Sequence, residues 1–185
     1  MSISFEITRD SGLLERYYKI REVCFRRELG IRSFDGSEDD FDRSGQILII
    51  RDGDKCIGGA RLSGSSPTNP GLLPLEVNGF LILRAFPEIA RRGESYCQWT
   101  RLALLPQYRE TENLRDLGLA LIREAKKAGY HYSFNVAGMN RARLYQRLHK
   151  SLGYDYEICQ ELKIPAEKGF MGLEHLLSVG YLEPN

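Results

Sequence analysis

The chain has 185 residues, of which 42% are hydrophobic and 28% are charged, and its formal net charge is +1. This length and composition predict a single globular domain over residues 1–185 and exclude a disordered or fibrous protein. Lys and Arg number 26 against 25 Asp and Glu. That balance argues against a nucleic-acid-binding protein, because phosphate binding normally needs a basic excess.

The predicted elements of the first half begin with a short strand and a long helix. Phe5 and Ile7 alternate with polar residues over residues 4–8, which predicts a strand. Apolar side chains recur at helical spacing over residues 12–30, and Gly30 marks the expected helix end. There follow an acidic loop (31–44), a strand (46–51), a hairpin turn (52–55), a returning strand (56–62), a long loop (63–75) and a helical segment interrupted by Pro87 (80–91).

The second half alternates strands with helices. The segment 96–105 is apolar with few charges, as strands in the centre of a sheet are. It is followed by a helix (112–128), a strand (131–136), a helix (140–152), a strand (154–164) and, within 169–182, a final strand. This order predicts a mixed α/β sheet with helices on both of its faces.

The cysteines bear on metals and on the compartment. Cys24, Cys56, Cys97 and Cys159 are scattered without a CxxC pair, and the three histidines lie far from any of them. This spacing argues against a zinc site, and we expect no metal. No apolar run reaches the roughly 18 residues that a membrane span needs, so none is expected. The N-terminal residues lack the apolar segment of a signal peptide, so we expect a cytoplasmic protein with reduced cysteines.

The first candidate site follows the strand that ends near Leu105. A helix predicted to begin near Leu114 would direct its free backbone N–H groups at an anion. Gly118 would let a phosphate approach closely, Ala120 would keep the next turn thin, and Arg109 and Arg115 would add positive charge. Gly and Ala serve equally well as helix-packing residues. The spacing Arg-x-x-Gly-x-Ala after a strand resembles the pyrophosphate-binding motif of the GNAT acyltransferase superfamily.

A second motif lies at residues 140–154, which read NRARLYQRLHKSLGY. An Asn at the start of a helix that ends in Leu-Gly-Tyr resembles the second GNAT motif. With the two patterns aligned on that ending, His149 takes the position where the family often has a Tyr, and Tyr145 lies one turn earlier. Either side chain could reach a thiol leaving group, and either could be an ordinary helix-surface residue. Together the motifs imply a GNAT fold, with a V-shaped cleft between two central strands.

The N-terminal half narrows the resemblance. The blocks YKIREVCFRREL (18–29), EDDFD (38–42), IGGARL (57–62), RAFPEIARRG (84–93) and WTRLAL (99–104) occur in the order typical of acyl-homoserine lactone synthases. That resemblance implies an S-adenosylmethionine pocket beside an N-terminal loop that is tied to the sheet. The residues matching the family's substrate-binding positions are Arg21, Phe25, Asp39, Asp42, Arg61, Phe86 and Arg101, and Trp99 precedes the last of them.

The residue types themselves allow two interpretations of this set. Two carboxylates three positions apart, together with arginines, could hold a zwitterionic amino acid, because Arg binds carboxylates through paired hydrogen bonds. The same groups could equally form an ion-pair network that pins a loop. Gln98 and Thr100 stand where the family has Glu and Ser, and Ile31 stands where it has Trp. Because Gln cannot act as a base, the acceptor could be S-adenosylmethionine or another amino acid or amine.

The sequence therefore predicts transfer of an acyl group from a phosphopantetheine thioester, carried by CoA or acyl-carrier protein, to an amine. Backbone N–H groups near Leu104 and Leu105 would polarise the thioester carbonyl, and a water held by Gln98 and Thr100 would accept the proton. Basic pairs at 26–27, 91–92 and 126–127 could dock an acidic carrier protein or could be solvated faces. Two alternatives remain: a plain GNAT acetyltransferase that uses acetyl-CoA, and a non-catalytic ligand-binding protein with this fold.

Overall fold

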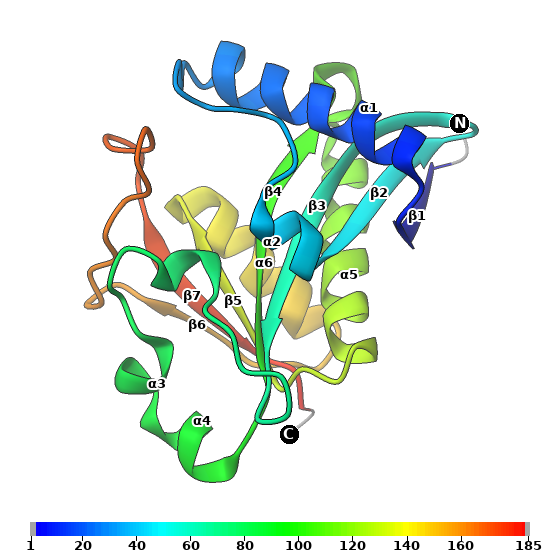
Figure 1. Ribbon diagram of the computed structural model, residues 1–185. Helices are drawn as coiled ribbons and strands as arrows, with labels where there is room; N and C mark the ends of the chain where they lie inside the picture. Colours follow the sequence, from blue (N-terminus) through cyan, green and yellow to red (C-terminus); the bar gives the residue numbers. More distant parts are fainter. Residues whose placement is uncertain (1–2, 184–185) are drawn as a thin grey trace. The chain divides into compact units, whose positions relative to one another are not determined.

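The computed structural model describes residues 3–183 as an α/β protein (Figure 1). Within these residues seven strands form one sheet in the hydrogen-bonded order β1-β2-β3-β4-β5-β7-β6. The strands are β1 (Ile3–Thr8), β2 (Gln46–Asp52), β3 (Lys55–Ser65), β4 (Tyr96–Leu104), β5 (Tyr132–Ala137), β6 (Tyr156–Cys159) and β7 (Leu176–Tyr181). The helices are α1 (Ser11–Glu22), α2 (Asp40–Ser44), α3 (Ile82–Ala85), α4 (Pro87–Arg92), α5 (Thr111–Lys127) and α6 (Met139–Ser151). The predicted mixed α/β architecture is confirmed.

The chain divides into two compact units that share strands and a helix. Unit 1 comprises Met1–Ser63 and Trp99–Ala120, and unit 2 comprises Gly64–Gln98 and Leu121–Asn185. Because β3, β4 and α5 each cross a boundary between these ranges, the chain passes from one unit to the other within regular elements. The single domain expected over residues 1–185 remains a prediction.

Unit 1 is built on the hairpin of β2 and β3, with β1 antiparallel to β2. Its core joins the apolar face of α1 to these strands through Leu14, Tyr17, Ile20, Ile47 and Ile49. Gly59 is required at this contact, because a Cβ there would lie 2.7 Å from the Tyr17 ring. The α1 helix is thereby fixed on the sheet, and Arg21 in its last turn is 1% exposed.

Unit 2 contains the parallel pair of β4 and β5, in which Tyr96–Gln98 pairs with residues 132–134. β7 lies antiparallel between β5 and β6, and α6 contacts all three of these strands. The core of the unit includes Phe86, Ile89, Phe134 and Val179. The parallel direction of β4 and β5 agrees with the predicted cleft, and the cleft itself remains a prediction.

The first half differs from the sequence expectation in three places. The helix expected over 12–30 is α-helical only to Glu22 and continues as a π-helical turn, Val23–Glu28, before Gly30 takes a φ of +71°. The expected loop 31–44 contains α2, because Asp39 and Asp42 form a reciprocal capping box. The strand expected to end at residue 62 continues to Ser65 as β3.

The second half differs mainly at helix starts and strand lengths. α5 begins at Thr111, one residue before the start expected from helical spacing and three before the one expected from the motif near Leu114. Gly138, and not Asn140, is the N-cap of α6. The segment 80–91 forms two short helices separated at Phe86, because Pro87 cannot donate a backbone hydrogen bond to the first helix. The strand expected over 154–164 is shorter, and the final strand is β7. Across residues 3–183, no helix combines the length and apolar character needed to cross a membrane.

Candidate active site

Four charged side chains predicted as substrate-binding residues converge in unit 1. Arg21 of α1 binds Asp42 of α2 through two parallel hydrogen bonds, from Nη1 at 2.9 Å and from Nη2 at 2.8 Å. Arg61 of β3 binds both carboxylate oxygens of Asp39, at 2.6 and 2.8 Å, and one oxygen of Asp42 at 3.2 Å. We call these four residues the ionic cluster. Two positive and two negative charges compensate one another within it.

The ionic cluster is desolvated, and its geometry keeps it charged. Burial alone would raise the pKa of Asp42, but the hydrogen bonds and charge of Arg21 outweigh that effect and hold the pKa below its ordinary value. Arg21 also donates to the carbonyls of Gly36, at 3.0 Å, and Ser37, at 2.5 Å. It therefore holds the loop that precedes α2 onto α1. One of the two functions expected of this set, pinning the N-terminal loop, thus corresponds to contacts in the structure.

Only one of the four members of the ionic cluster is open to solvent. The side chain of Asp39 is 40% exposed, whereas those of Arg21, Asp42 and Arg61 are 1% exposed or less. Arg61 donates from Nε to Thr100 Oγ1 at 3.0 Å. Its Nη2 is buried without a hydrogen-bond partner among the described residues. The carboxylate of Asp39 can therefore bind a cationic group from solvent, whereas the two arginines of the cluster are buried.

An aromatic pair lies in the same unit. Phe25, predicted from the sequence, stacks on Phe34 with ring centroids 4.8 Å apart. The guanidinium of Arg101 lies 5.3 Å from the Phe34 centroid, and Arg101 has a φ of +55°, which is rare outside glycine. The Tyr17 hydroxyl fixes this backbone by donating to the Arg101 carbonyl at 2.6 Å. The sequence comparison places Ile31 where the related family has Trp, and it missed the aromatic Phe34, three residues later.

Two predicted substrate-binding residues are core residues. Trp99 is 8% exposed, and its indole Nε1 has no hydrogen-bond partner among the described residues. Phe86 is 9% exposed and packs against Phe134 in the core of unit 2, with centroids 5.2 Å apart. A core position explains Phe86 fully, and any contact with substrate remains a prediction.

Gln98 performs a defined structural task in unit 2. Its side chain is 4% exposed, and its Oε1 accepts a hydrogen bond from the Leu75 backbone N–H at 3.0 Å. The neighbouring Glu76 accepts from Leu73 N–H at 2.9 Å and from Ile82 N–H at 3.0 Å. These side chains anchor residues 73–82. Sequence reasoning did not single out Glu76, and no capping-box pattern marks it, because Leu73 at the N-cap position has no side-chain oxygen.

His149 and Tyr145 differ in their surroundings. The sequence allows His149 to be a surface residue of the helix or a partner for a leaving thiol, but in the structure it is 1% exposed and its ring lies 4.6 Å from that of Tyr156. Its Nδ1 donates to the Tyr145 carbonyl at 2.8 Å, and desolvation lowers its pKa to about 4. The imidazole is therefore neutral at pH 7 and is a poor proton donor. Tyr145 is half-buried, and desolvation raises its pKa, so its phenol stays protonated.

Two of the groups predicted to bind the thioester near the end of β4, the Leu105 N–H and the Arg109 side chain, already have partners within the protein. Leu105 N–H donates to the Ile57 carbonyl at 2.9 Å, so the expectation that it polarises a thioester is wrong for this conformation. Arg109 donates from Nε to the Leu104 carbonyl at 2.7 Å and from Nη2 to Glu28 at 2.5 Å. Burial would lower the pKa of Arg109, but Glu28 outweighs that effect and raises it. Arg109 therefore ties the end of β4 to the π-helical turn.

The predicted anion site at the start of α5 needs a correction. α5 starts at Thr111. The predicted residues Arg115, Gly118 and Ala120 therefore lie inside the helix, where each backbone N–H bonds to the carbonyl four residues earlier. Gly118 is buried, and Arg115 is exposed beside Asp116 at 3.2 Å. The unpaired N–H groups of a helix belong to its first turn, which here begins at Thr111. The backbone N–H groups of α5 that are free to bind an anion therefore belong to residues earlier than those predicted.

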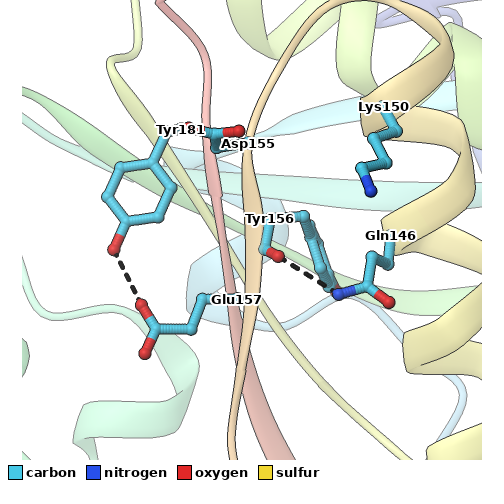
Figure 2. A pocket seen from close by; sticks show the side chains of 6 residues that line it. All are labelled: Gln146, Lys150, Asp155, Tyr156, Glu157 and Tyr181. Carbon is cyan, nitrogen blue, oxygen red and sulfur yellow. Dashed lines mark hydrogen bonds between the residues drawn. The ribbon is translucent and has the colours of Figure 1, made fainter.

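A hollow of about 300 Å³ lies beside the edge strand β6 (Figure 2). Gln146 and Lys150 reach it from α6, and the Gln146 amide donates to the Tyr156 carbonyl at 3.3 Å. Glu157 and Tyr181 form its other side and are joined by a hydrogen bond of 3.1 Å. None of the site residues predicted from the sequence lines this hollow.

Three possible metal ligands also meet on the chain near β6. Ligand atoms of Glu157, Cys159 and Glu161 lie within 4.8 Å of one another. Glu157 already accepts a hydrogen bond from the Tyr181 hydroxyl, and Glu157 and Glu161 are exposed, as acidic side chains on a protein surface commonly are.

Comparison with known proteins identifies the fold. No protein-family model matches the chain, and no curated protein matches it in sequence. FeeM, an N-acyl amino acid synthase from uncultured soil microbes, aligns with a TM-score of 0.62 and 12% identity over 98% of this chain and 91% of that one. The CoA-dependent acyl-homoserine lactone synthase BjaI, solved with SAM and isopentyl-CoA, aligns with a TM-score of 0.59 and 19% identity over 94% of this chain and 78% of that one. A Bacillus subtilis acetyltransferase in complex with CoA aligns with a TM-score of 0.54 and 13% identity over 97% of this chain and 98% of that one.

These three proteins are acyltransferases, and each is aligned over most of its length. The identities are low, so the alignments establish how the chain folds and leave its reaction open. The GNAT-type architecture expected from the two sequence motifs is confirmed: the chain has the fold of the GNAT acyltransferases.

Proposed function

We propose that the protein is an N-acyltransferase that moves an acyl group from a phosphopantetheine thioester to an amine. The observation that carries this proposal is the ionic cluster: residues matching separate blocks of the acyl-homoserine lactone synthases come together as one charge-compensated set with Asp39 at its open side. The fold supports the same class of reaction. Phe25 and Phe34 add an apolar surface in the same unit.

The acceptor in this proposal carries a positively charged amino group. Asp39 is the exposed carboxylate, so it binds the ammonium, and Arg61 holds Asp39 in place through its two short hydrogen bonds. S-adenosylmethionine and free amino acids both fit this chemistry. BjaI was solved with SAM, and FeeM is an N-acyl amino acid synthase. Gln98 stands in place of the family's Glu, and its amide cannot accept a proton.

The proposed reaction forms a C–N bond and breaks a C–S bond. The ammonium first loses a proton to water, and the neutral amine then attacks the thioester carbonyl carbon. The tetrahedral intermediate expels the thiolate, and the nitrogen loses its second proton to water. The thiolate takes up a proton from water, so the products are the amide, the free thiol and one solvated proton. Holding both substrates in register supplies most of the rate, and effective molarity contributes roughly 7–11 kcal/mol.

The acyl donor is an acyl-CoA or an acyl-carrier protein. CoA is bound in the Bacillus subtilis acetyltransferase, and isopentyl-CoA in BjaI. A carrier protein would need a basic surface, and Arg26 and Arg27 are exposed on the π-helical turn. The acetyltransferase with bound CoA also favours a second candidate, transfer of an acetyl group from acetyl-CoA without a long acyl chain.

The test is thiol release by the purified protein. Acetyl-CoA, long-chain acyl-CoA and acyl-carrier protein are each offered with S-adenosylmethionine or with single amino acids, and the products are identified by mass spectrometry. Asp39→Asn should raise the acceptor KM about tenfold with little change in kcat, while keeping the N-cap of α2, because Asn also caps helices well. Asp40→Asn is the matched control, since the Asp40 side chain is 94% exposed.

Each outcome separates the candidates. Release with acetyl-CoA alone favours the second candidate. Tight binding of CoA thioesters or S-adenosylmethionine without any thiol release identifies a non-catalytic ligand-binding protein, for which the buried amide of Gln98 would be the reason. An equal effect of the Asp39 and Asp40 variants on the acceptor KM contradicts the ammonium site at Asp39.

A further inference from the structure

Exposed aliphatic side chains are concentrated in one short stretch of unit 2. Eight large hydrophobic side chains are exposed among the described residues, and four of them fall between residues 72 and 83. These are Leu72 at 59%, Val77 at 58%, Leu81 at 41% and Leu83 at 43%. Single exposed hydrophobic residues are normal, whereas a local concentration marks a surface that meets a partner.

The backbone of this stretch is fixed, so the exposed side chains cannot turn inward. Leu73, Leu75 and Ile82 alternate with them in sequence and already fill the core of unit 2. The Glu76 carboxylate accepts backbone hydrogen bonds from Leu73 and Ile82, and Gln98 accepts one from Leu75. Because the backbone of this stretch is already ordered in the free protein, binding of a partner to the surface would cost little conformational entropy.

Arginines outnumber carboxylates at the end of the same stretch, where Arg84, Arg91 and Arg92 stand against Glu88 alone. Arg84 of α3 and Arg91 and Arg92 of α4 are exposed, and the two short helices contact each other (Figure 1). Arg84 and Arg91 form no ion pair with another described residue, and Arg92 lies 3.9 Å from Glu94. The Glu76 carboxylate, which could have balanced this charge, is 5% exposed and is occupied by the backbone.

We propose that residues 72–92 form a docking surface for an anionic lipid bilayer. Leucine and valine side chains insert into the boundary between headgroups and acyl chains, while arginines extend their long stems to lipid phosphates. Protein-binding hot spots instead favour Trp, Tyr and Arg, and Leu and Val are under-represented in them. Since the aliphatic members of this surface are Leu and Val, a bilayer fits better than an acidic protein. The surface would bring the protein to a membrane without spanning it.

The experiment is co-sedimentation of the full chain with phosphatidylcholine vesicles that contain or lack phosphatidylserine. Binding should require phosphatidylserine and weaken with added salt. Leu81→Ser combined with Leu83→Ser should lower the partition coefficient about tenfold. Replacing Arg84, Arg91 and Arg92 by Gln should lower it by roughly fivefold for each arginine.

Matched controls use exposed residues outside the surface. Ile7→Ser with Leu29→Ser removes two other exposed aliphatic side chains, and Arg26→Gln with Arg27→Gln removes two other arginines. Both controls should bind vesicles as the unaltered protein does, and circular dichroism should show all variants folded. Absence of binding to phosphatidylserine vesicles, or equal losses in the controls, overturns the proposal. Retention on an acidic carrier protein through residues 72–92 without vesicle binding would assign the surface to a protein instead.

Discussion

Asp42 is the residue on which the ionic cluster depends most. Its side chain is fully buried and accepts from Arg21, from Arg61 and from the backbone N–H of Asp39. Asp42→Asn removes the charge that compensates Arg21, so we expect a loss of about 3 kcal/mol in the free energy of unfolding. Urea denaturation measures this loss. Asp40→Asn should change the stability by less than about 0.5 kcal/mol, because Asp40 is exposed. A loss below about 1 kcal/mol for Asp42→Asn would contradict the buried ion pair.

His149 should make stability depend on pH below neutrality. Its pKa is about 4 in the folded protein and about 6.5 when unfolded, so the unfolded chain binds more protons between these values. The free energy of unfolding is therefore highest above pH 6.5 and falls as the pH drops towards 4, by up to about 3 kcal/mol. Urea denaturation midpoints measured between pH 4 and 7 test this pH dependence, because that range spans the pKa of His149 in the folded and in the unfolded protein. His149→Gln should flatten the slope, and His175→Gln should leave it unchanged.

At the scale of elements, the contact between α6 and β7 depends on a missing side chain. A Cβ at Gly180 would lie 2.3 Å from His149 Nε2. Gly180→Ala should therefore lower the free energy of unfolding by about 1–3 kcal/mol, because the buried imidazole has no room to move. In a His149→Ala background the same change should be nearly neutral. Additive losses in the double variant would show that the two residues do not collide.

Sequence patterns predicted the elements well and their ends poorly. Alternation and helical spacing located the strands and the long helices, since burial of one face is a local property of the chain. The start of α5 was predicted at residue 112 from helical spacing and near Leu114 from the motif, whereas the helix begins at Thr111, because nothing in the local sequence shows that the Glu110 carbonyl already accepts from Leu114 N–H. The α2 helix was missed because an acidic, turn-rich segment is typical of a loop. Its capping box is stabilised by hydrogen bonds that Asp42 accepts from Arg21 and Asp39 accepts from Arg61, two arginines that are distant in sequence.

The site shows the same division between local and long-range information. The members of the ionic cluster were found through family resemblance, and residue chemistry explained why they should pair. Two features depend on tertiary contacts and could not be found that way: the use of Leu105 N–H by Ile57, and the inward position of His149. Phe34 was missed because stacking on Phe25 requires the turn at Gly30, whose φ of +71° redirects the chain.

At the scale of the whole molecule, the cysteines offer a test of whether the chain is one domain. Cys24 and Cys56 belong to unit 1, Cys97 and Cys159 belong to unit 2, and all four are buried free thiols. Desolvation raises the pKa of each, so none should react with a disulfide reagent at neutral pH while the protein is folded. In concentrated urea all four should react, because none is held in a disulfide.

The order in which the four cysteine thiols become reactive in urea distinguishes a chain that unfolds as one domain from a chain that unfolds as two. β3, β4 and α5 pass through both units, so melting either unit removes hydrogen-bonded partners from elements of the other. We therefore expect all four thiols to become reactive at one urea concentration, the one at which circular dichroism reports unfolding. Mass spectrometry of peptides labelled at increasing urea concentrations identifies each thiol. Exposure of Cys24 and Cys56 in one transition and of Cys97 and Cys159 in another would mean that the shared elements do not couple the units, and that the chain unfolds as two domains.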